Sequence, residues 1–128
     1  MSADGTDAAA TASQPGVAAP MMETIGDELL DQALAERRAL VQLCLYALDR
    51  ARSAGVVERI EEGLAGIGVR AVRPDGDRFD PSRHEAGGTV STDDQTLDGV
   101  VAETEVVGFT DRDRPLRPPI VTVYTAKA

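Results

Sequence analysis

The stretch RFDPSRHEAGG, from Arg78 to Gly88, holds the only histidine of the chain together with two carboxylates. Asp80, His84 and Glu85 stand close enough in sequence to suggest a metal site or general acid–base chemistry. Imidazole and carboxylate groups are what hydrolytic metal centres and nucleophilic triads use. Either site would also need further ligands or an activated nucleophile from elsewhere in the chain.

The remaining sequence supplies none of these groups. The aspartates of DGDRFDPSRHEA suggest a calcium loop, but an EF-hand needs an oxygen ligand at its fifth position, glycine at the sixth and glutamate at the twelfth. Those positions hold Phe79, Asp80 and Ala86. One histidine and one cysteine, Cys44, cannot form a zinc cage, and no nucleophile elbow or phosphate loop accompanies His84. We therefore expect no metal, no cofactor, no catalytic residue and no enzymatic activity.

A structural role explains the motif better. Asp80 precedes a proline, which disfavours helix, and its carboxylate is placed to accept hydrogen bonds from the next backbone amides. Phe79 is one of only two phenylalanines and would anchor such a turn. We expect His84 to pack or hydrogen-bond there, and the turn to be the hinge between helices and sheet.

Composition limits both the fold and the partners. The chain has 128 residues, 3% aromatics and no tryptophan, which predicts a small aliphatic core that would gain stability from a second copy. A net charge of −9 argues against nucleic acid and anionic membranes and favours a basic surface on a partner protein. Without a bilayer-length apolar run or a signal peptide, and with a lone Cys44, we expect a soluble, cytoplasmic protein.

Three segments follow along the chain, predicted as a disordered tail (1–20), a helical dimerisation region (21–68) and a β wing domain (69–128). Apolar residues three and four apart predict a first helix that ends at Gly55, and a second begins at Val56. Such a hairpin is half of a four-helix bundle, and a homodimer would supply the other half. The residues expected in the dimer contact are Leu40, Leu43, Cys44, Leu48, Ile60 and Leu64.

Helical spacing disappears after residue 68. VRAV, DGVVAETEVVGF and RPPIVTVYTA each predict one strand because they are rich in valine, isoleucine and threonine. TDRDRPL predicts a polar reversal between the last two strands. The fold class expected is therefore α+β: an N-terminal helical hairpin followed by a small all-β wing.

The sequence from 66 to 86 and from 106 to 128 resembles the C-terminal half of GrpE, the nucleotide exchange factor of bacterial Hsp70 chaperones. The resemblance covers Leu40 to the C-terminus. It rests on these motifs: Gly68-Val69, Gly76, Phe79-Asp80-Pro81, His84-Glu85-Ala86, Gly108-Phe109, Arg117-Pro118 and Val121/Val123.

The resemblance implies a dimeric four-helix bundle whose β wing presses on the nucleotide-binding domain of an Hsp70 and favours its open form. It also implies that the wing hairpin contacts the chaperone. Arg114 matches a cationic residue of that hairpin. Arg117 matches an arginine of the closing strand that either contacts the chaperone or supports the fold. An apolar position of the incoming strand is occupied by Glu105, or by Val106 or Val107 if one residue is inserted. The partner-binding residues expected on this basis are Glu105, Val107, Phe109, Arg114 and Arg117.

Some features depart from the family pattern. The helical stalk ahead of Leu40 is short, Gly87-Gly88 replaces apolar residues, and Pro119 replaces a small residue. We therefore keep two functional hypotheses. The first is a short-stalk exchange factor. The alternative is a non-exchanging dimeric interaction protein that retains the GrpE-like shape.

Overall fold

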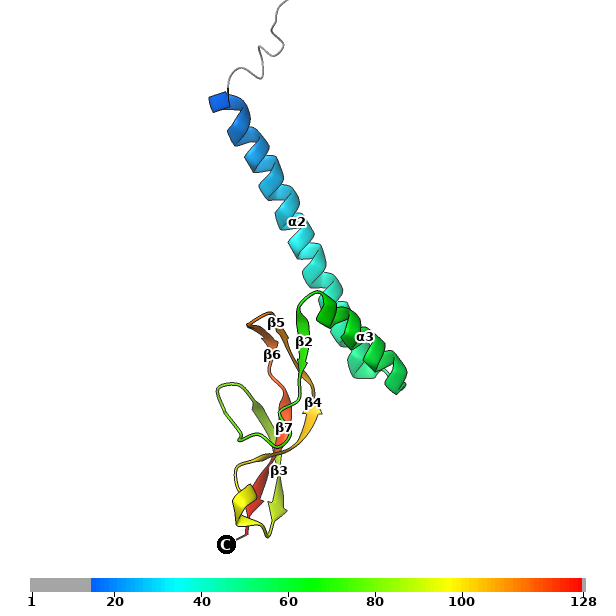
Figure 1. Cartoon of the computed structure of the whole chain (residues 1–128), viewed down its shortest axis with the longest axis vertical. Helices are drawn as coiled ribbons and strands as arrows, with labels where there is room; N and C mark the ends of the chain where they lie inside the picture. The colour runs from blue at the N-terminus through cyan, green and yellow to red at the C-terminus, as the bar shows by residue number, and fades with distance from the viewer. Residues whose placement is uncertain (1–14, 128) are drawn as a thin grey trace, which may run out of the picture. The chain divides into compact units, whose positions relative to one another are not determined.

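The computed structural model describes residues 15–127, with side chains from Pro20 onward. The chain divides into two compact units, one up to Cys44 and one from Leu45 to the C-terminus. Two helices come first and small β-sheets follow (Figure 1). The expected α+β class, with a helical region before a β wing, is confirmed.

Helix α2 spans Pro15–Arg50 and is longer than the sequence pattern indicates. It begins ahead of the expected Met21, because proline suits the first helical turn and the alanines after it favour helix. Part of the expected tail is thus helical, and the rest lies outside the described residues. The helix ends at Arg50, whose guanidinium donates a hydrogen bond to the Tyr46 carbonyl (3.2 Å).

Helix α3 spans Ala54–Gly66 and begins with a side-chain cap. The Ser53 hydroxyl accepts a hydrogen bond from the Val56 amide (3.3 Å), which satisfies one of the free amides of the first turn. Gly55 therefore lies inside α3, and the expectation that it ends the first helix is wrong. The C-terminal end of α3 is closed by Gly68, which has a φ of +93° and whose amide donates to the Ala65 carbonyl (3.0 Å).

The strands form two separate three-stranded sheets (Figure 1). In the first, β5 lies between β2 and β6 and is antiparallel to both. In the second, β7 lies between β3, to which it is parallel, and β4, to which it is antiparallel. The strands of the two sheets are β2 (Val69–Val72), β5 (Gly108–Asp111) and β6 (Arg114–Arg117), then β3 (Glu85–Thr92), β7 (Ile120–Ala126) and β4 (Val101–Val106).

Two expected single strands each divide between the two sheets. DGVVAETEVVGF becomes β4 and β5 with Val107 between them, and RPPIVTVYTA contributes Arg117 to β6 before β7 begins at Ile120. Pro118 and Pro119 have no amide hydrogen for a strand ladder, so the chain changes sheets there. Both crossings lie side by side, because a Cβ on Gly108 would approach the Pro119 nitrogen to 2.5 Å.

The core of the second unit is aliphatic with a single aromatic ring, as the composition predicts. Each of its residues is at most 4% exposed: Leu45, Leu64, Val69, Val101, Phe109 and Val121. The helix α3 packs against β2, so the helical and β segments share this core. The wing is therefore continuous with the end of the helical region.

Candidate functional site

The histidine motif forms a closed polar turn. The Asp80 amide donates to Nδ1 of His84 (3.0 Å), and the His84 amide donates to the Asp80 carbonyl (2.8 Å). The Asp80 carboxylate accepts hydrogen bonds from the Ser82 hydroxyl (2.7 Å) and amide (2.9 Å), which lower the pKa of that carboxyl. The Phe79 and His84 rings lie 5.9 Å apart. The expected Asx-type turn and the hydrogen bonding of His84 within it are confirmed by these contacts.

The position of this turn differs from the expectation. It lies between β2 and β3 and so connects the two sheets of the wing, whereas α3 joins the wing at Gly68. The expectation of a hinge between helices and sheet is therefore wrong. Its downstream end is fixed by the Glu85 amide, which donates to the Pro119 carbonyl (2.9 Å).

No cluster of three or more metal-ligating side chains occurs within residues 15–127. A groove of about 460 Å³ lies between the histidine turn and the β5–β6 hairpin. His84, Thr110, Pro115 and Arg117 are among the residues that line it. His84 thus faces a groove of mixed character, in which three prolines and Val72 lie among polar and charged side chains.

The β5–β6 hairpin ends in a tight and strained turn. Asp111 pairs with Arg114, so only Arg112 and Asp113 form the loop. Arg112 has a φ of +56°, a conformation that costs a non-glycine residue roughly 1–2 kcal/mol. Its amide donates to the Gly68 carbonyl (2.8 Å), which ties the hairpin end to the beginning of β2. Backbone strain of this kind is common at functional sites.

Arg114 is one of two exposed arginines of the hairpin, and Arg112 is the other. Arg114 is the first residue of β6. Within residues 15–127 its side chain makes no hydrogen bond or ion pair. Arg112, by contrast, has its guanidinium 3.7 Å from the Asp111 carboxylate. Arg114 therefore has no contact within the described part of the chain, and the partner contact that the resemblance implies for it stays a prediction.

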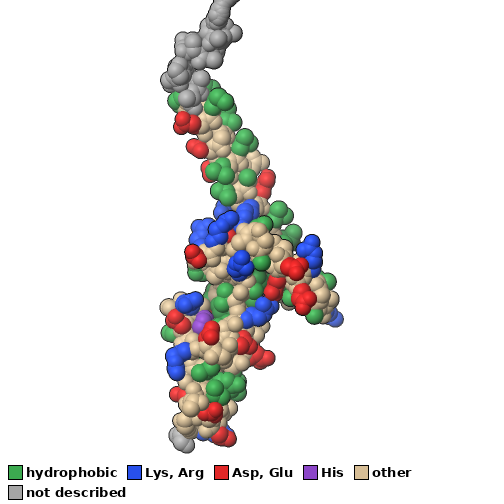
Figure 2. Space-filling view, viewed as in Figure 1, with side chains coloured by type: hydrophobic (Ala, Val, Ile, Leu, Met, Phe, Trp, Pro, Cys, Tyr) green, Lys and Arg blue, Asp and Glu red, His purple; other side chains and the backbone are tan. Residues whose placement is uncertain are grey.

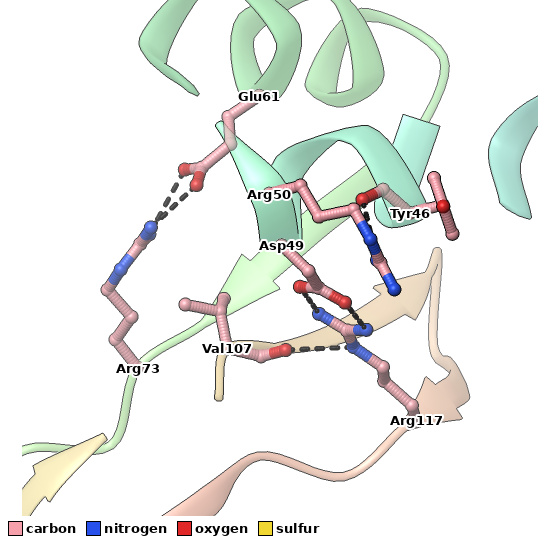
Figure 3. Close-up of polar contacts among 7 residues, drawn as sticks. All are labelled: Tyr46, Asp49, Arg50, Glu61, Arg73, Val107 and Arg117. Atoms are coloured by element: carbon pink, nitrogen blue, oxygen red, sulfur yellow. Dashed lines mark hydrogen bonds and ion pairs between the residues drawn. The ribbon is translucent and has the colours of Figure 1, made fainter. Parts of the chain in front are cut away.

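Arg117 is engaged inside the chain (Figure 3). Its two terminal nitrogens donate to the two carboxylate oxygens of Asp49, each at 2.8 Å. Its Nε donates to the Val107 carbonyl (3.0 Å), and its guanidinium lies 5.4 Å from the centre of the Phe109 ring. The hydrogen bonds between the partners lower the pKa of Asp49 and raise that of Arg117. Of the two roles that the resemblance left open, these contacts favour structure.

The other expected partner-binding residues differ in exposure. Phe109 is 1% exposed and belongs to the core, which corrects the expectation that it contacts a partner. Val107 is half-buried between β4 and β5. Glu105 is exposed and sits where the register between β4 and β7 shifts.

The residues expected in a dimer contact also separate by exposure. Leu40 and Leu43 are 63% and 61% exposed, while Cys44, Leu48 and Ile60 are half-buried. Leu64 is 4% exposed and belongs to the core of the single chain, so it is not available to a second copy. Figure 2 shows hydrophobic side chains at the surface along α2.

Two acidic residues that hold arginines of the wing, Asp49 and Glu61, could not be identified from the sequence. Asp49 meets Arg117 across a sequence separation of 68, and Glu61 binds Arg73 with hydrogen bonds of 3.0 and 2.6 Å (Figure 3). No local pattern marks either pair, because acidic residues on helices are usually solvated. Only the approach of helix and strand reveals them.

Comparison with known proteins identifies the family. The family model GrpE matches residues 54–125, from the start of α3 into β7. The chain belongs to the GrpE family. It is 35% identical over 107 residues to Protein GrpE of Methylobacterium nodulans, covering 75% of this chain and 46% of that relative. It is 33% identical over 110 residues to Protein GrpE of Ralstonia nicotianae (84% and 45%), and 38% identical over 73 residues to that of Trichormus variabilis (57% and 29%).

The chain spans less than half the length of these GrpE relatives. The family match includes the histidine turn, the β5–β6 hairpin and Arg117, but Asp49 precedes it. No helix within residues 15–127 is long and apolar enough to cross a membrane.

Proposed function

We propose that this GrpE-family chain is a nucleotide exchange factor that promotes release of ADP from an Hsp70-type chaperone in the cytoplasm. The observation that supports this proposal most directly is that the β5–β6 hairpin presents an exposed Arg114, which has no partner within the described residues. This hairpin lies within the part that the family model matches. The activity requires no covalent step by this chain.

The proposed mechanism is a difference in affinity. A protein that binds the open nucleotide-binding domain more tightly than the closed one shifts the domain towards opening. ADP binds best when the domain is closed, so factor and nucleotide weaken each other's binding by the same factor. Arg114 would supply a charge-assisted contact to a carboxylate on the open domain.

We also propose that the chain forms a homodimer through the exposed apolar side chains of α2. Leu40 and Leu43 are three positions apart on the helix and are both more than 60% exposed, which is costly in water. We expect Leu43→Glu to give a monomer in sedimentation equilibrium. The matched control is Val90→Glu, which places the same charge at a 40% exposed apolar position of β3. If Leu43→Glu and Val90→Glu both self-associate as strongly as the wild type does, the proposed dimer contact is contradicted.

The test of exchange is release of a fluorescent ADP from the Hsp70 proteins of the same organism. The wild-type chain should accelerate release, and Arg114→Ala should lower the acceleration about tenfold, as expected for an arginine hot spot. Arg59→Ala is the matched control, because Arg59 is an exposed arginine on α3 outside the hairpin.

The outcomes separate the two hypotheses. Acceleration that depends on Arg114 but not on Arg59 supports an exchange factor acting through its wing. No acceleration by a folded preparation, with any Hsp70 of the organism, would contradict the proposal. It would favour the alternative, a dimeric interaction protein that keeps the GrpE-like fold without exchange activity.

A further inference from the structure

One polar joint connects the end of helix α2 to the first sheet of the wing. Arg117 at the end of β6 holds Asp49 of α2 through two parallel hydrogen bonds of 2.8 Å, and it holds the Val107 carbonyl at 3.0 Å (Figure 3). Both charged residues belong to the same compact unit, from Leu45 onward. A single side chain thus joins the helix, the crossing between β4 and β5, and β6.

The geometry of this joint is specific. A guanidinium and a carboxylate that meet through two parallel bonds fix each other's orientation as well as their separation. The Arg117 side chain is 26% exposed, and the Phe109 ring lies beneath its guanidinium. Three of its nitrogens already donate within the chain, so Arg117 has little capacity left for a partner.

We propose that Asp49 and Arg117 form a latch that positions the β5–β6 hairpin, and that the latch sets how well the protein discriminates the open from the closed chaperone. This inference rests on the proposed function. In it Arg114 is the contact and Asp49 is a positioning residue. A ligand shifts a conformational equilibrium only by its differential affinity for the two states. A hairpin free to tilt would adapt to the closed state and fit the open state less well, so the differential affinity would fall.

A second joint limits which part of the wing the latch controls. Arg73, just after β2, holds Glu61 of α3 through a separate pair of hydrogen bonds (Figure 3). This pair and the core packing of α3 on β2 keep the wing attached when the latch is broken. We therefore expect Asp49→Asn to leave the fold intact and to loosen mainly β5 and β6.

The experiment compares three variants with the wild type. Asp49→Asn keeps the shape but removes the charge, and Asp49→Glu restores the charge. Asp93→Asn makes the same chemical change in the exposed Asp93–Lys127 pair (3.6 Å) near the C-terminus. For each protein, affinity is measured for the Hsp70 nucleotide-binding domain without nucleotide and with ADP. The ratio of the two affinities is the readout, because a general loss of folded protein lowers both affinities and leaves the ratio unchanged.

We expect Asp49→Asn to lower the ratio about tenfold, in keeping with a charge-assisted pair that is partly exposed. Asp49→Glu should recover the ratio to within about threefold of the wild type, and Asp93→Asn should leave it unchanged. A ratio for Asp49→Asn equal to that of the wild type, in a chain that does accelerate ADP release, overturns the latch.

Amide hydrogen exchange of the protein alone tests the joint independently of any chaperone. Breaking the latch should speed exchange in β5 and β6 by about tenfold, while β3 and β7 keep the wild-type rates. If Asp49→Asn leaves the exchange rates of β5 and β6 equal to those of the wild type, the proposal is overturned. If the wild type binds neither chaperone form, the proposed function fails and discrimination by the latch fails with it, whereas the exchange rates still decide whether Asp49 holds the hairpin.

Discussion

Gly108 offers the sharpest test of how the wing is built. A Cβ at this position would lie 2.5 Å from both the nitrogen and Cδ of Pro119 and 3.1 Å from the Arg117 carbonyl oxygen. Two of these three atoms belong to the backbone, so a rotamer change cannot relieve the contact. Pro119 is buried, and its carbonyl also accepts the Glu85 amide at the start of β3. Any shift of Pro119 therefore disturbs both sheets.

The cost of Gly108→Ala follows from two opposing effects. Overpacking a closed site destabilises by about 1–3 kcal/mol, while replacing glycine by alanine stabilises by about 0.4–1 kcal/mol through the unfolded chain. We expect a net loss of about 2 kcal/mol for a contact this short. At roughly 4–8 °C per kcal/mol for a domain of this size, Tm should fall by about 8–16 °C.

Gly88→Ala is the matched control within the wing. A Cβ at Gly88 in β3 would meet only Thr122 Cγ2, at 3.9 Å, which is ordinary van der Waals contact. This variant should be as stable as the wild type or gain up to about 1 kcal/mol. Urea unfolding followed by circular dichroism, at one fixed protein concentration, measures both variants. A Gly108→Ala protein within about 0.5 kcal/mol of the wild type would refute the close crossing at Pro119.

Three further predictions concern the turns and the latch. Hydrogen bonds from Arg117 hold the pKa of Asp49 below its ordinary value of 3.8, so its contribution to stability is complete above that value and is lost as the pH falls through the folded-state pKa. In urea unfolding, the advantage of the wild type over Asp49→Asn should therefore be full near pH 6 and shrink below about pH 4. His84→Ala removes the acceptor for the Asp80 amide and should cost about 1 kcal/mol in urea without changing ADP release from the folded protein. Arg112→Asn should stabilise the hairpin by about 0.5–1 kcal/mol in thermal unfolding, because asparagine tolerates a positive φ.

Each of these predictions has a result that would contradict it. An advantage over Asp49→Asn that persists unchanged to pH 3 would show that the carboxylate is not responsible, with Asp93→Asn as the control for acidification. A folded His84→Ala protein that loses exchange activity would make the histidine part of the interface. An Arg112→Asn protein less stable than the wild type would mean that the arginine side chain contributes more than its strain costs.

The histidine motif shows how far local reasoning reaches. The order Asp-Pro-Ser-Arg-His predicted an Asx-type turn from residues two to four positions apart, and the structure contains those contacts. The role of the turn as a hinge to the helices was wrong, because a local pattern does not say which elements the turn connects. Its place between β2 and β3 depends on strand pairings far along the chain.

Only some features of the candidate hairpin could likewise be predicted from the sequence. Its position and its polarity followed from the sequence, since a run of alternating aspartate and arginine next to a proline cannot be a core strand. Arg114 was singled out by the resemblance to GrpE. The burial of Phe109 and the engagement of Arg117 did not follow. Both depend on Asp49 and on the core of the wing, to which the hairpin residues are close only in space.

By itself the sequence determined the presence of two helices, the α+β class and the turn at Asp80, because these depend on composition and on spacings of a few residues. Its motifs also carried the resemblance to the GrpE family. The tertiary structure alone decided that the β segments divide into two sheets and that Arg117 serves the fold while Arg114 faces solvent. The physical reason is that an arginine in a short polar strand has the same local propensity in either role. Its role is set by whether a carboxylate distant in sequence, here Asp49, comes within hydrogen-bonding distance.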